Sequence, residues 1–372
     1  MRTQEHPLSA APVGSVRTLT SLHFGPAGGR RALLQCSLHA DEIPPMLVGY
    51  HLRQLLAELE AQGRLQGEVV LLPACNPIGL GQQVWGRLQG RFDVASGQNF
   101  NRHYPDLVEG ALARFQASGQ ALQDDTAANA RALRQCLQAE LAARPAASAL
   151  QQLRHQLMQL ALDADVVLDL HCDNEAVMHV YATPQFEAHA LQLAECVNAP
   201  LLLLAEESGD APFDEAHSMI WPRLRARLGP AVPLACFAAT VELRGEAEVQ
   251  HGLAQADAEG LLAFLAQQGF ISGMPATAPA QPCRARPLAG CIPLVMPHAG
   301  LLAWRLPLGR TVEQGEHLAD LIDPVSGTCT AIRAPVAGLF FARELQRWAQ
   351  AGQSVGKVAG EQALRSGKLL SA

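Results

Sequence analysis

Three residues of metal-binding type stand near the ends of short apolar stretches. His39 and Glu42 lie three positions apart at the end of residues 31–39, and His171 directly follows residues 165–170. Imidazole nitrogen and carboxylate oxygen both bind zinc at about 2.0–2.2 Å, and a catalytic zinc has three protein ligands and one open position. If the two stretches are neighbouring strands, these side chains predict a site for one zinc ion per chain.

A fourth residue, Glu242, stands near the end of another apolar stretch, residues 236–243. Ligand sites in α/β proteins collect at the carboxyl ends of strands, so Glu242 is expected close to the histidines and free to act as a general base. Each residue also has an ordinary interpretation: an H-x-x-E pair is common by chance, His171 can be held by a nearby acid, and Glu242 can form a surface ion pair. The joint order of the four residues favours the site.

The elements that must position these residues follow from the hydrophobic pattern. Short apolar stretches predict buried strands of a mixed or parallel sheet at residues 31–39, 68–73, 165–170, 177–182, 200–205 and 236–243. Apolar residues at helical spacing predict helices after Pro44, within 106–162, over 186–197 and over 253–268. We expect Asp41 and Glu42 at the positive end of the first helix. The predicted fold class is α/β, a mixed sheet flanked by helices.

The character of the sequence changes near residue 280. Residues 273–290 are rich in Pro, Ala and Gly, and short strand-like stretches with frequent turn residues follow. We therefore expect two domains. The first is a catalytic α/β domain of residues 1–280 with a helical insertion at about 106–160, and the second is a smaller all-β domain of residues 281–372.

Composition and charge narrow the class of protein. The formal charge of −7 argues against nucleic acid, because binding to phosphates needs a basic face. No apolar stretch approaches the length of a membrane span, and the N-terminus lacks a secretion signal. The nine cysteines are scattered without a C-x-x-C pair, as in proteins with reduced thiols. We expect a cytoplasmic protein that acts on a small molecule, without a nucleic-acid or membrane partner. A homo-oligomer remains an open option.

Four motifs in order along the chain carry a resemblance to a known family. They are HADE at 39–42, NFNRHYP at 99–105, DLH at 169–171 and TVEL at 240–243. Together they resemble the succinylglutamate desuccinylase/aspartoacylase family of zinc-carboxypeptidase-like amidohydrolases. The resemblance spans roughly residues 30–270 and implies a zinc-carboxypeptidase-like fold, with the helices at 106–160 as an insertion.

The resemblance implies roles for the four residues named above. His39, Glu42 and His171 correspond to the zinc ligands of the family, and Glu242 corresponds to the glutamate that activates the water molecule. This matches the general logic of metal-assisted hydrolysis, in which the ion acidifies water and a nearby base takes its proton.

Further polar residues are implied as substrate contacts. Asn101 and Arg102 match the family's N-R pair, which holds a substrate carboxylate, and a guanidinium fork suits a carboxylate. The family also uses an upstream arginine to polarise the scissile carbonyl; Arg91 is our candidate, with Arg87 as the alternative. Where many members carry small glycines after the glutamate, this chain has Arg244, which is a candidate pocket cation or else a structural arginine.

The C-terminal part resembles biotinyl/lipoyl-like β domains. The resembling positions are Gly309, Val312, Gly315, Glu316, 321–323, 332–338, Gly352 and Val355. The carrier lysine of such domains would stand in the hairpin at 324–328, which reads PVSGT and contains no lysine. A structural or pocket-covering role is therefore expected instead of a swinging cofactor arm.

These observations predict a zinc-dependent amidohydrolase that removes the acyl group from an N-acyl amino acid or a similar small amide with a carboxylate. A zinc carboxypeptidase or dipeptide hydrolase that uses the same site is the alternative, and a non-catalytic binding protein is the third hypothesis. The chain has neither a G-x-x-x-x-G-K-[ST] phosphate loop nor a G-x-S-x-G nucleophile elbow.

Overall fold

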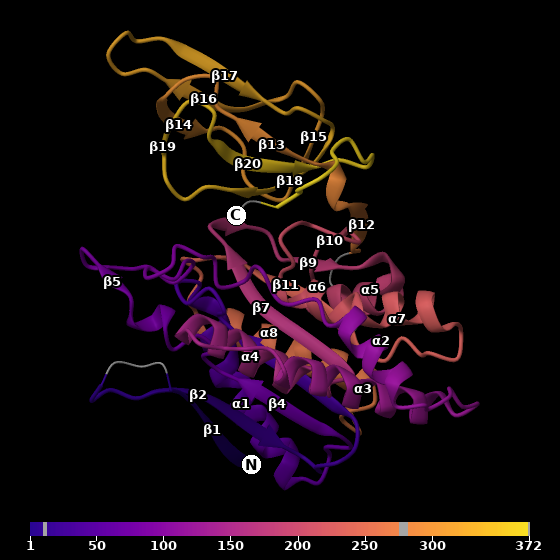
Figure 1. The fold of residues 1–372 in the computed structure, drawn as a ribbon. Helices are drawn as coiled ribbons and strands as arrows, with labels where there is room; N and C mark the ends of the chain where they lie inside the picture. Colours follow the sequence, from indigo (N-terminus) through magenta and orange to yellow (C-terminus); the bar gives the residue numbers. More distant parts are fainter. Residues whose placement is uncertain (10–12, 275–281, 371–372) are drawn as a thin grey trace.

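The fold is taken from a computed structural model that describes residues 1–9, 13–274 and 282–370. Figure 1 shows a larger region of helices and strands with a smaller region of strands seated on one end of it. We call the described residues up to 287 the α/β region and residues 288–360 the β region. The expected domain boundary near residue 280 lies outside the described residues.

A nine-stranded mixed sheet forms the centre of the α/β region. Its strands, in spatial order, are β1 (Arg2–Leu8), β2 (Arg17–Phe24), β4 (Glu68–Leu72), β3 (Arg31–Cys36), β7 (Val166–Asp173), β11 (Phe237–Gly245), β9 (His179–Ala182), β10 (Leu201–Leu204) and β12 (Arg284–Pro287). The four central strands run parallel, whereas β9 is antiparallel to β11. The central strands are buried on both faces, which explains their continuous apolar sequence.

Helices cover both faces of this sheet. They are α1 (Pro44–Ala61), α2 (Val108–Ala117), α3 (Thr126–Ala142), α4 (Ala149–Ala161), α5 (Glu187–Cys196), α6 (Phe213–Ser218), α7 (Ile220–Leu228) and α8 (His251–Gln267). Successive strand residues alternate between faces. Leu34 and Leu168 therefore belong to the core cluster shared with α1, α5 and α8, whereas Leu33 and Val167 belong to the cluster shared with α2, α3 and α4. The predicted α/β fold class is confirmed.

The first helix begins at Pro44, as the sequence pattern predicts, and the two acids lie just before it. Ile43 is its N-cap and the prolines at 44 and 45 occupy its first positions, while its first turn contains no acid. Asp41 and Glu42 precede the helix in a turn closed by a hydrogen bond from the Glu42 N–H to the His39 carbonyl. The position of Glu42 outside the helix has a chemical consequence, because its side chain is free to turn towards His171.

The β region consists of two small antiparallel sheets around their own core. One contains β13 (Cys291–Val295), β20 (Ser354–Ala359), β18 (Gly338–Arg343) and β15 (Arg310–Val312), and the other contains β17 (Cys329–Arg333), β16 (His317–Ile322), β14 (Gly300–Trp304) and β19 (Trp348–Ala349). The sequence 324–328 forms the connection between β16 and β17. An all-β C-terminal region was predicted and is confirmed.

A short strand directly after β7 attaches the β region to the α/β region. This strand, β8 (Glu175–Ala176), pairs with β18 through Arg343 and Ala342. The Glu175 carboxylate also forms ion pairs with Arg343 and with Arg347, the latter at 2.5 Å. The β region is thereby fixed over the carboxyl end of the central strands (Figure 1).

Two further features complete the fold. A small hairpin of β5 (Gln83–Val84) and β6 (Arg87–Leu88) projects from the α/β region (Figure 1). Among the described residues, none of the helices has the length and apolar character that crossing a membrane would require.

Candidate metal centre and active site

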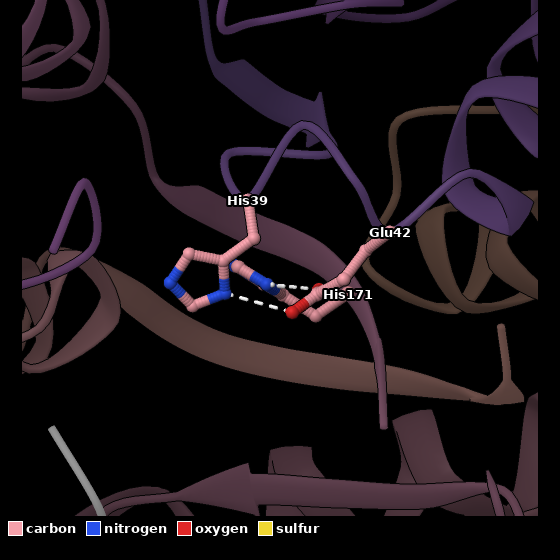
Figure 2. Close-up of side chains that lie close together, drawn as sticks. All are labelled: His39, Glu42 and His171. Atoms are coloured by element: carbon pink, nitrogen blue, oxygen red, sulfur yellow. Dashed lines mark hydrogen bonds and ion pairs between the residues drawn. The ribbon is translucent and has the colours of Figure 1, made fainter. Parts of the chain in front are cut away.

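The turn after β3 brings the first two predicted ligands together. Ser37 has a left-handed backbone, with φ of 59°, and its hydroxyl donates a hydrogen bond of 2.6 Å to the carbonyl of Glu42. This turn folds the chain back on itself, so that His39 and Glu42 point to the same place (Figure 2). The neighbouring parallel strand, β7, brings His171 to them, as the convergence of strand ends predicted.

The three side chains form a compact buried cluster. His39 Nδ1 lies 2.8 Å from one carboxylate oxygen of Glu42, and His171 Nδ1 lies 2.7 Å from the other (Figure 2). The ligand atoms all lie within 4.8 Å of one another. Only 3%, 6% and 2% of the surface of His39, Glu42 and His171 is exposed. The cluster can hold one metal ion.

The outer nitrogen of each histidine has an oxygen partner. His39 Nε2 lies 2.8 Å from the amide oxygen of Asn99, and His171 Nε2 lies 2.9 Å from the carboxylate of Asp169. A histidine that donates its outer N–H to an oxygen keeps the lone pair of the other nitrogen for a metal ion. The two Nδ1 atoms face Glu42, so the donor set fits a divalent ion with nitrogen and oxygen ligands.

Charges reinforce the cluster. Burial raises the pKa of Glu42, but His39 and His171 overcome this effect and hold that pKa well below its ordinary value. The backbone N–H of Cys172 donates a further hydrogen bond of 3.1 Å to the Glu42 carboxylate. The carboxylate is therefore kept in the ionised form that a metal ligand requires.

Glu242 lies beside this cluster on the adjacent strand. It is the register partner of His171 across the β7–β11 pair, and it lines the same cavity as His39, Glu42 and His171. Its Oε2 atom is buried and accepts no hydrogen bond from the described residues. Burial raises the pKa of Glu242 to about 8, and the charge of Glu42 contributes to the rise. A carboxyl group with a raised pKa is suited to accept and return a proton near neutral pH.

Arg91, and not Arg87, reaches the cluster. The Arg91 Nη1 atom lies 3.2 Å from a Glu42 oxygen and 3.3 Å from His39 Nδ1, and the residue lines the cavity. Arg87 belongs to the projecting strand β6 and is not among the cavity-lining residues. Of the two alternatives, the structure brings Arg91 to the His39–Glu42–His171 cluster.

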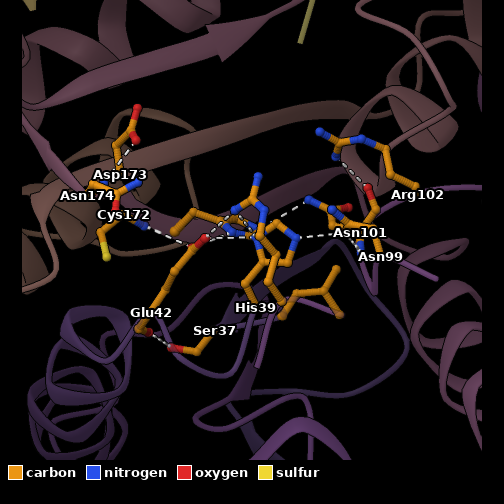
Figure 3. A network of polar contacts seen from close by, with 12 residues as sticks. Ser37, His39, Glu42, Asn99, Asn101, Arg102, Cys172, Asp173 and Asn174 are labelled. Carbon is orange, nitrogen blue, oxygen red and sulfur yellow. Dashed lines mark hydrogen bonds and ion pairs between the residues drawn. The ribbon is translucent and has the colours of Figure 1, made fainter. Parts of the chain in front are cut away.

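Asn101 and Arg102 also line the cavity and are buried. The Asn101 side chain lies 3.3 Å from His171 Nε2 and accepts a hydrogen bond of 2.8 Å from the backbone of Phe213. The Arg102 guanidinium donates a bond of 2.7 Å to the Asn101 carbonyl. In Figure 3, His39 and Glu42 lie in the middle, with Arg102 on one side of them and Asp173 on the other.

The structure does not bring Arg244 into this site. Its guanidinium forms a two-bond ion pair with Asp257 of α8, and its Nε lies 3.2 Å from Glu248. Arg244 is not among the residues that line the cavity. Its left-handed φ of 64° turns the side chain towards the helix, which accounts for its placement as a structural arginine.

Residues of both regions line one cavity of about 760 Å³. Asp169, one of the acids beside His171 in the sequence, is the one that holds it, although the sequence analysis gave it no role in the site. Sequence reasoning also missed Tyr181 on β9 and Lys357 on β20, whose Nζ lies 3.1 Å from Asp173. No motif marks Lys357, because only the seating of the β region brings it to the cavity.

Comparison with known proteins agrees with this geometry. The sequence profile of the succinylglutamate desuccinylase/aspartoacylase catalytic domain matches residues 28–267. A search of curated proteins gives no significant match.

Solved structures extend the likeness to nearly the whole chain. A structure described as a succinylglutamate desuccinylase/aspartoacylase family protein from Shewanella amazonensis is 26% identical, with a TM-score of 0.86 over 96% of this chain and 98% of that one. A counterpart from Shewanella frigidimarina is 23% identical, with a TM-score of 0.82 over 96% of each chain. The ectoine utilization protein of Ruegeria pomeroyi, in a product-bound structure, is 18% identical, with a TM-score of 0.67 over 96% of this chain and 94% of that one.

The matched profile covers more than half of the chain and contains His39, Glu42, His171 and Glu242. The chain belongs to the succinylglutamate desuccinylase/aspartoacylase family.

Proposed function

We propose that this protein is a zinc-dependent deacylase that hydrolyses the amide bond of an N-acyl amino acid or a similar small amide with a carboxylate. One observation carries the proposal. A buried His-Glu-His cluster, fit for one metal ion, lies beside the Glu242 carboxyl group, which faces the same cavity and has one oxygen without a hydrogen-bond partner among the described residues. Family membership supports the reaction class, a hydrolysis of small amides.

A zinc ion held by His39, Glu42 and His171 would supply a Lewis acid that lowers the pKa of water and polarises a carbonyl group. Glu242 takes the proton from the attacking water and delivers it to the leaving amine. Burial raises the pKa of Glu242, which supports both steps, because the group must give up the proton that it accepts.

The two arginines of the cavity have different tasks in this proposal. Arg91, which lies at hydrogen-bond distance from Glu42 and His39, donates to the oxyanion that develops on the scissile carbonyl. Arg102 lies farther along the cavity, beside Asn101, and binds the substrate carboxylate. Shielding by the β region keeps these charges in a partly dehydrated environment, in which they act more strongly.

A panel of substrates tests the proposal. The purified protein, loaded with one equivalent of zinc, is given N-acetyl, N-succinyl and β-aspartyl amino acids and a set of dipeptides, and amine release is measured. We expect release from at least one N-acyl amino acid and little from the dipeptides. Cleavage of dipeptides alone would favour a peptidase, and a failure to bind zinc would leave only a non-catalytic role.

A further inference from the structure

The last described residues of the chain form a segment that returns from the β region to the α/β region. We call residues 361–370 the strap. Its first half is attached to the base of the β region, because the N–H groups of Leu364 and Arg365 both donate to the Ala289 carbonyl at 3.0 Å. The Arg365 guanidinium donates another bond of 3.0 Å to the Cys291 carbonyl.

The second half of the strap is attached to the α/β region. The N–H groups of Leu369 and Leu370 donate to the Ser208 carbonyl at 2.9 and 3.2 Å. Lys368 forms an ion pair with Asp210, and its side chain packs against Gly209, where an added Cβ would come within 2.9 Å of it. Both leucines also pack against the small apolar cluster between the regions, and the strap lines the active-site cavity.

The residues that receive the strap are the ones that hold the loop of Arg102. The His103 N–H donates to the Asp210 carbonyl at 2.7 Å, and the Tyr104 N–H donates to the Ala211 carbonyl at 3.1 Å. A continuous path of hydrogen bonds thus leads from the strap through residues 208–211 to the loop that carries Arg102. The path contains no atom of the His39–Glu42–His171 cluster.

Backbone conformation shows why this loop needs support. His103, Asp210 and Ala211 all have left-handed φ values, of 59°, 60° and 46°. Residues other than glycine adopt this conformation at an energetic cost, and they keep it only where surrounding contacts enforce it. The contacts on one side of residues 208–211 come from the strap.

We propose that the strap is a positioning element for substrate binding: it holds residues 208–211 and, through them, the loop of Arg102 at the end of the cavity away from Asp173. The inference rests on the proposed function for the identity of the substrate, but not for the structural coupling. The strap acts on affinity, and the metal centre and Glu242 act on the chemical step. Leu369 and Lys368 are therefore positioning residues.

A matched pair of substitutions at one position tests the backbone bond. Leu369→Pro removes the N–H that donates to Ser208, whereas Leu369→Ala loses part of the side chain and keeps the N–H. We expect KM for the preferred substrate to be higher in Leu369→Pro than in Leu369→Ala by a factor on the order of ten, with equal kcat and equal zinc content. Equal KM values in the two variants, or a loss confined to kcat, would contradict the proposal.

Hydrogen exchange gives a readout that does not depend on activity. The amides of His103 and Tyr104 are expected to exchange several-fold faster in Leu369→Pro than in Leu369→Ala, because their acceptors on Asp210 and Ala211 are no longer held. Unchanged exchange at both amides overturns the inference, whatever the substrate is. If the wild-type protein hydrolyses nothing while the exchange changes as expected, the proposed function fails and the coupling stands.

A second pair of variants covers the case in which the proline variant does not fold. Lys368→Met removes the charge that pairs with Asp210, and Lys368→Arg retains it. We expect a smaller rise in KM and in amide exchange for the first variant and recovery in the second. Ser366→Ala, at an exposed strap position outside the cavity lining, is the neutral control.

Discussion

The α/β region and the β region contribute to the same cavity in different ways. We call the α/β residues His39, Glu42, His171 and Glu242 the floor of the cavity. The first three are almost fully buried, and the hydrogen bonds between them fix their orientation. The β-region residues that line the cavity form what we call its wall. Among them is Lys357, whose side chain is 34% exposed and has Asp173 as its ion-pair partner. Buried, mutually oriented groups are suited to chemistry, and half-exposed charges are suited to recognition. The floor is expected to set the rate, whereas Lys357 is expected to contribute to the affinity, together with Arg102 of the α/β region.

The sharpest test of this division is Glu242→Gln at the floor. The substitution keeps the size of the side chain and removes the base, so kcat is expected to fall by roughly 10²–10⁴-fold while the zinc content stays at one per chain. Steady-state kinetics and metal analysis measure the two quantities. Glu248→Gln, which changes an acid outside the cavity, is the control. A fully active Glu242→Gln enzyme would remove Glu242 from the mechanism.

The pH dependence of the wild-type enzyme adds to this test. The pKa of Glu242 is raised from 4.5 to about 8 in the protein without an ion, and a nearby cation lowers the pKa of a carboxyl group. Because the base must be ionised, kcat/KM is expected to fall as the pH drops, with an apparent pKa between those two values. A pH profile that is flat across this range would contradict the assignment.

A smaller effect, on zinc affinity, is expected for substitution of Asp169, which contacts His171 from outside the cavity lining. This residue is fully buried, and it accepts hydrogen bonds from Gln35 at 2.8 Å and from Asn101 at 3.4 Å in addition to its contact with His171. Asp169→Asn is expected to weaken zinc affinity by roughly 10–100-fold, because His171 loses the partner that orients its ring. Competition with a chelator measures the affinity.

The matched control for Asp169→Asn is Asp165→Asn. Asp165 directly precedes β7 and pairs with Arg134 at 2.9 Å, far from the strand end that carries His171. This variant is expected to lower thermal stability and to leave zinc affinity unchanged. If both variants lose zinc equally, the effect comes from the strand as a whole and not from the contact with His171.

The smallest effect is expected at the wall. Lys357→Met removes the ammonium group and leaves the Asp173 carboxylate without this partner, so KM is expected to change by a few-fold while kcat is retained. Arg305→Met, directly after β14 of the β region, removes a comparable exposed pair with Asp320 and should change neither constant. A large loss of kcat in Lys357→Met would mean that the β region takes part in the chemical step, and would contradict the division of roles between the two regions.

Much of the floor was predictable from the sequence because its residues stand at the ends of apolar strands. Parallel strands bring their carboxyl ends to one edge, so His39 and His171 converge without any knowledge of the loops. The edge strand β1 was missed because its sequence, RTQEHPL, is mostly polar and exposed and lacks an apolar period. The strand β12 was missed because it lies in a stretch rich in proline and alanine.

Placement of arginines was the less predictable part of the site. Arg91 and Arg244 both stand close to family motifs, yet only Arg91 reaches the cavity. Their separation depends on the left-handed backbone at Arg244 and on Asp257, a residue of α8 that is distant from the motifs. Ion-pair partners of this kind are set by tertiary packing and cannot be read from local sequence patterns.

The pairing of β8 with β18 also bears on how the active site comes into being. Glu175 and Arg343 are separated by 168 positions in the chain, and their contact attaches the β region to the α/β region. This contact closes a long loop, which carries an entropic cost, and it requires that both regions have already folded. During synthesis His39, Glu42 and His171 emerge long before the strands that cover them. On refolding, we expect helical signal and zinc binding to recover before substrate affinity does, as measured by stopped-flow spectroscopy and by activity at intervals.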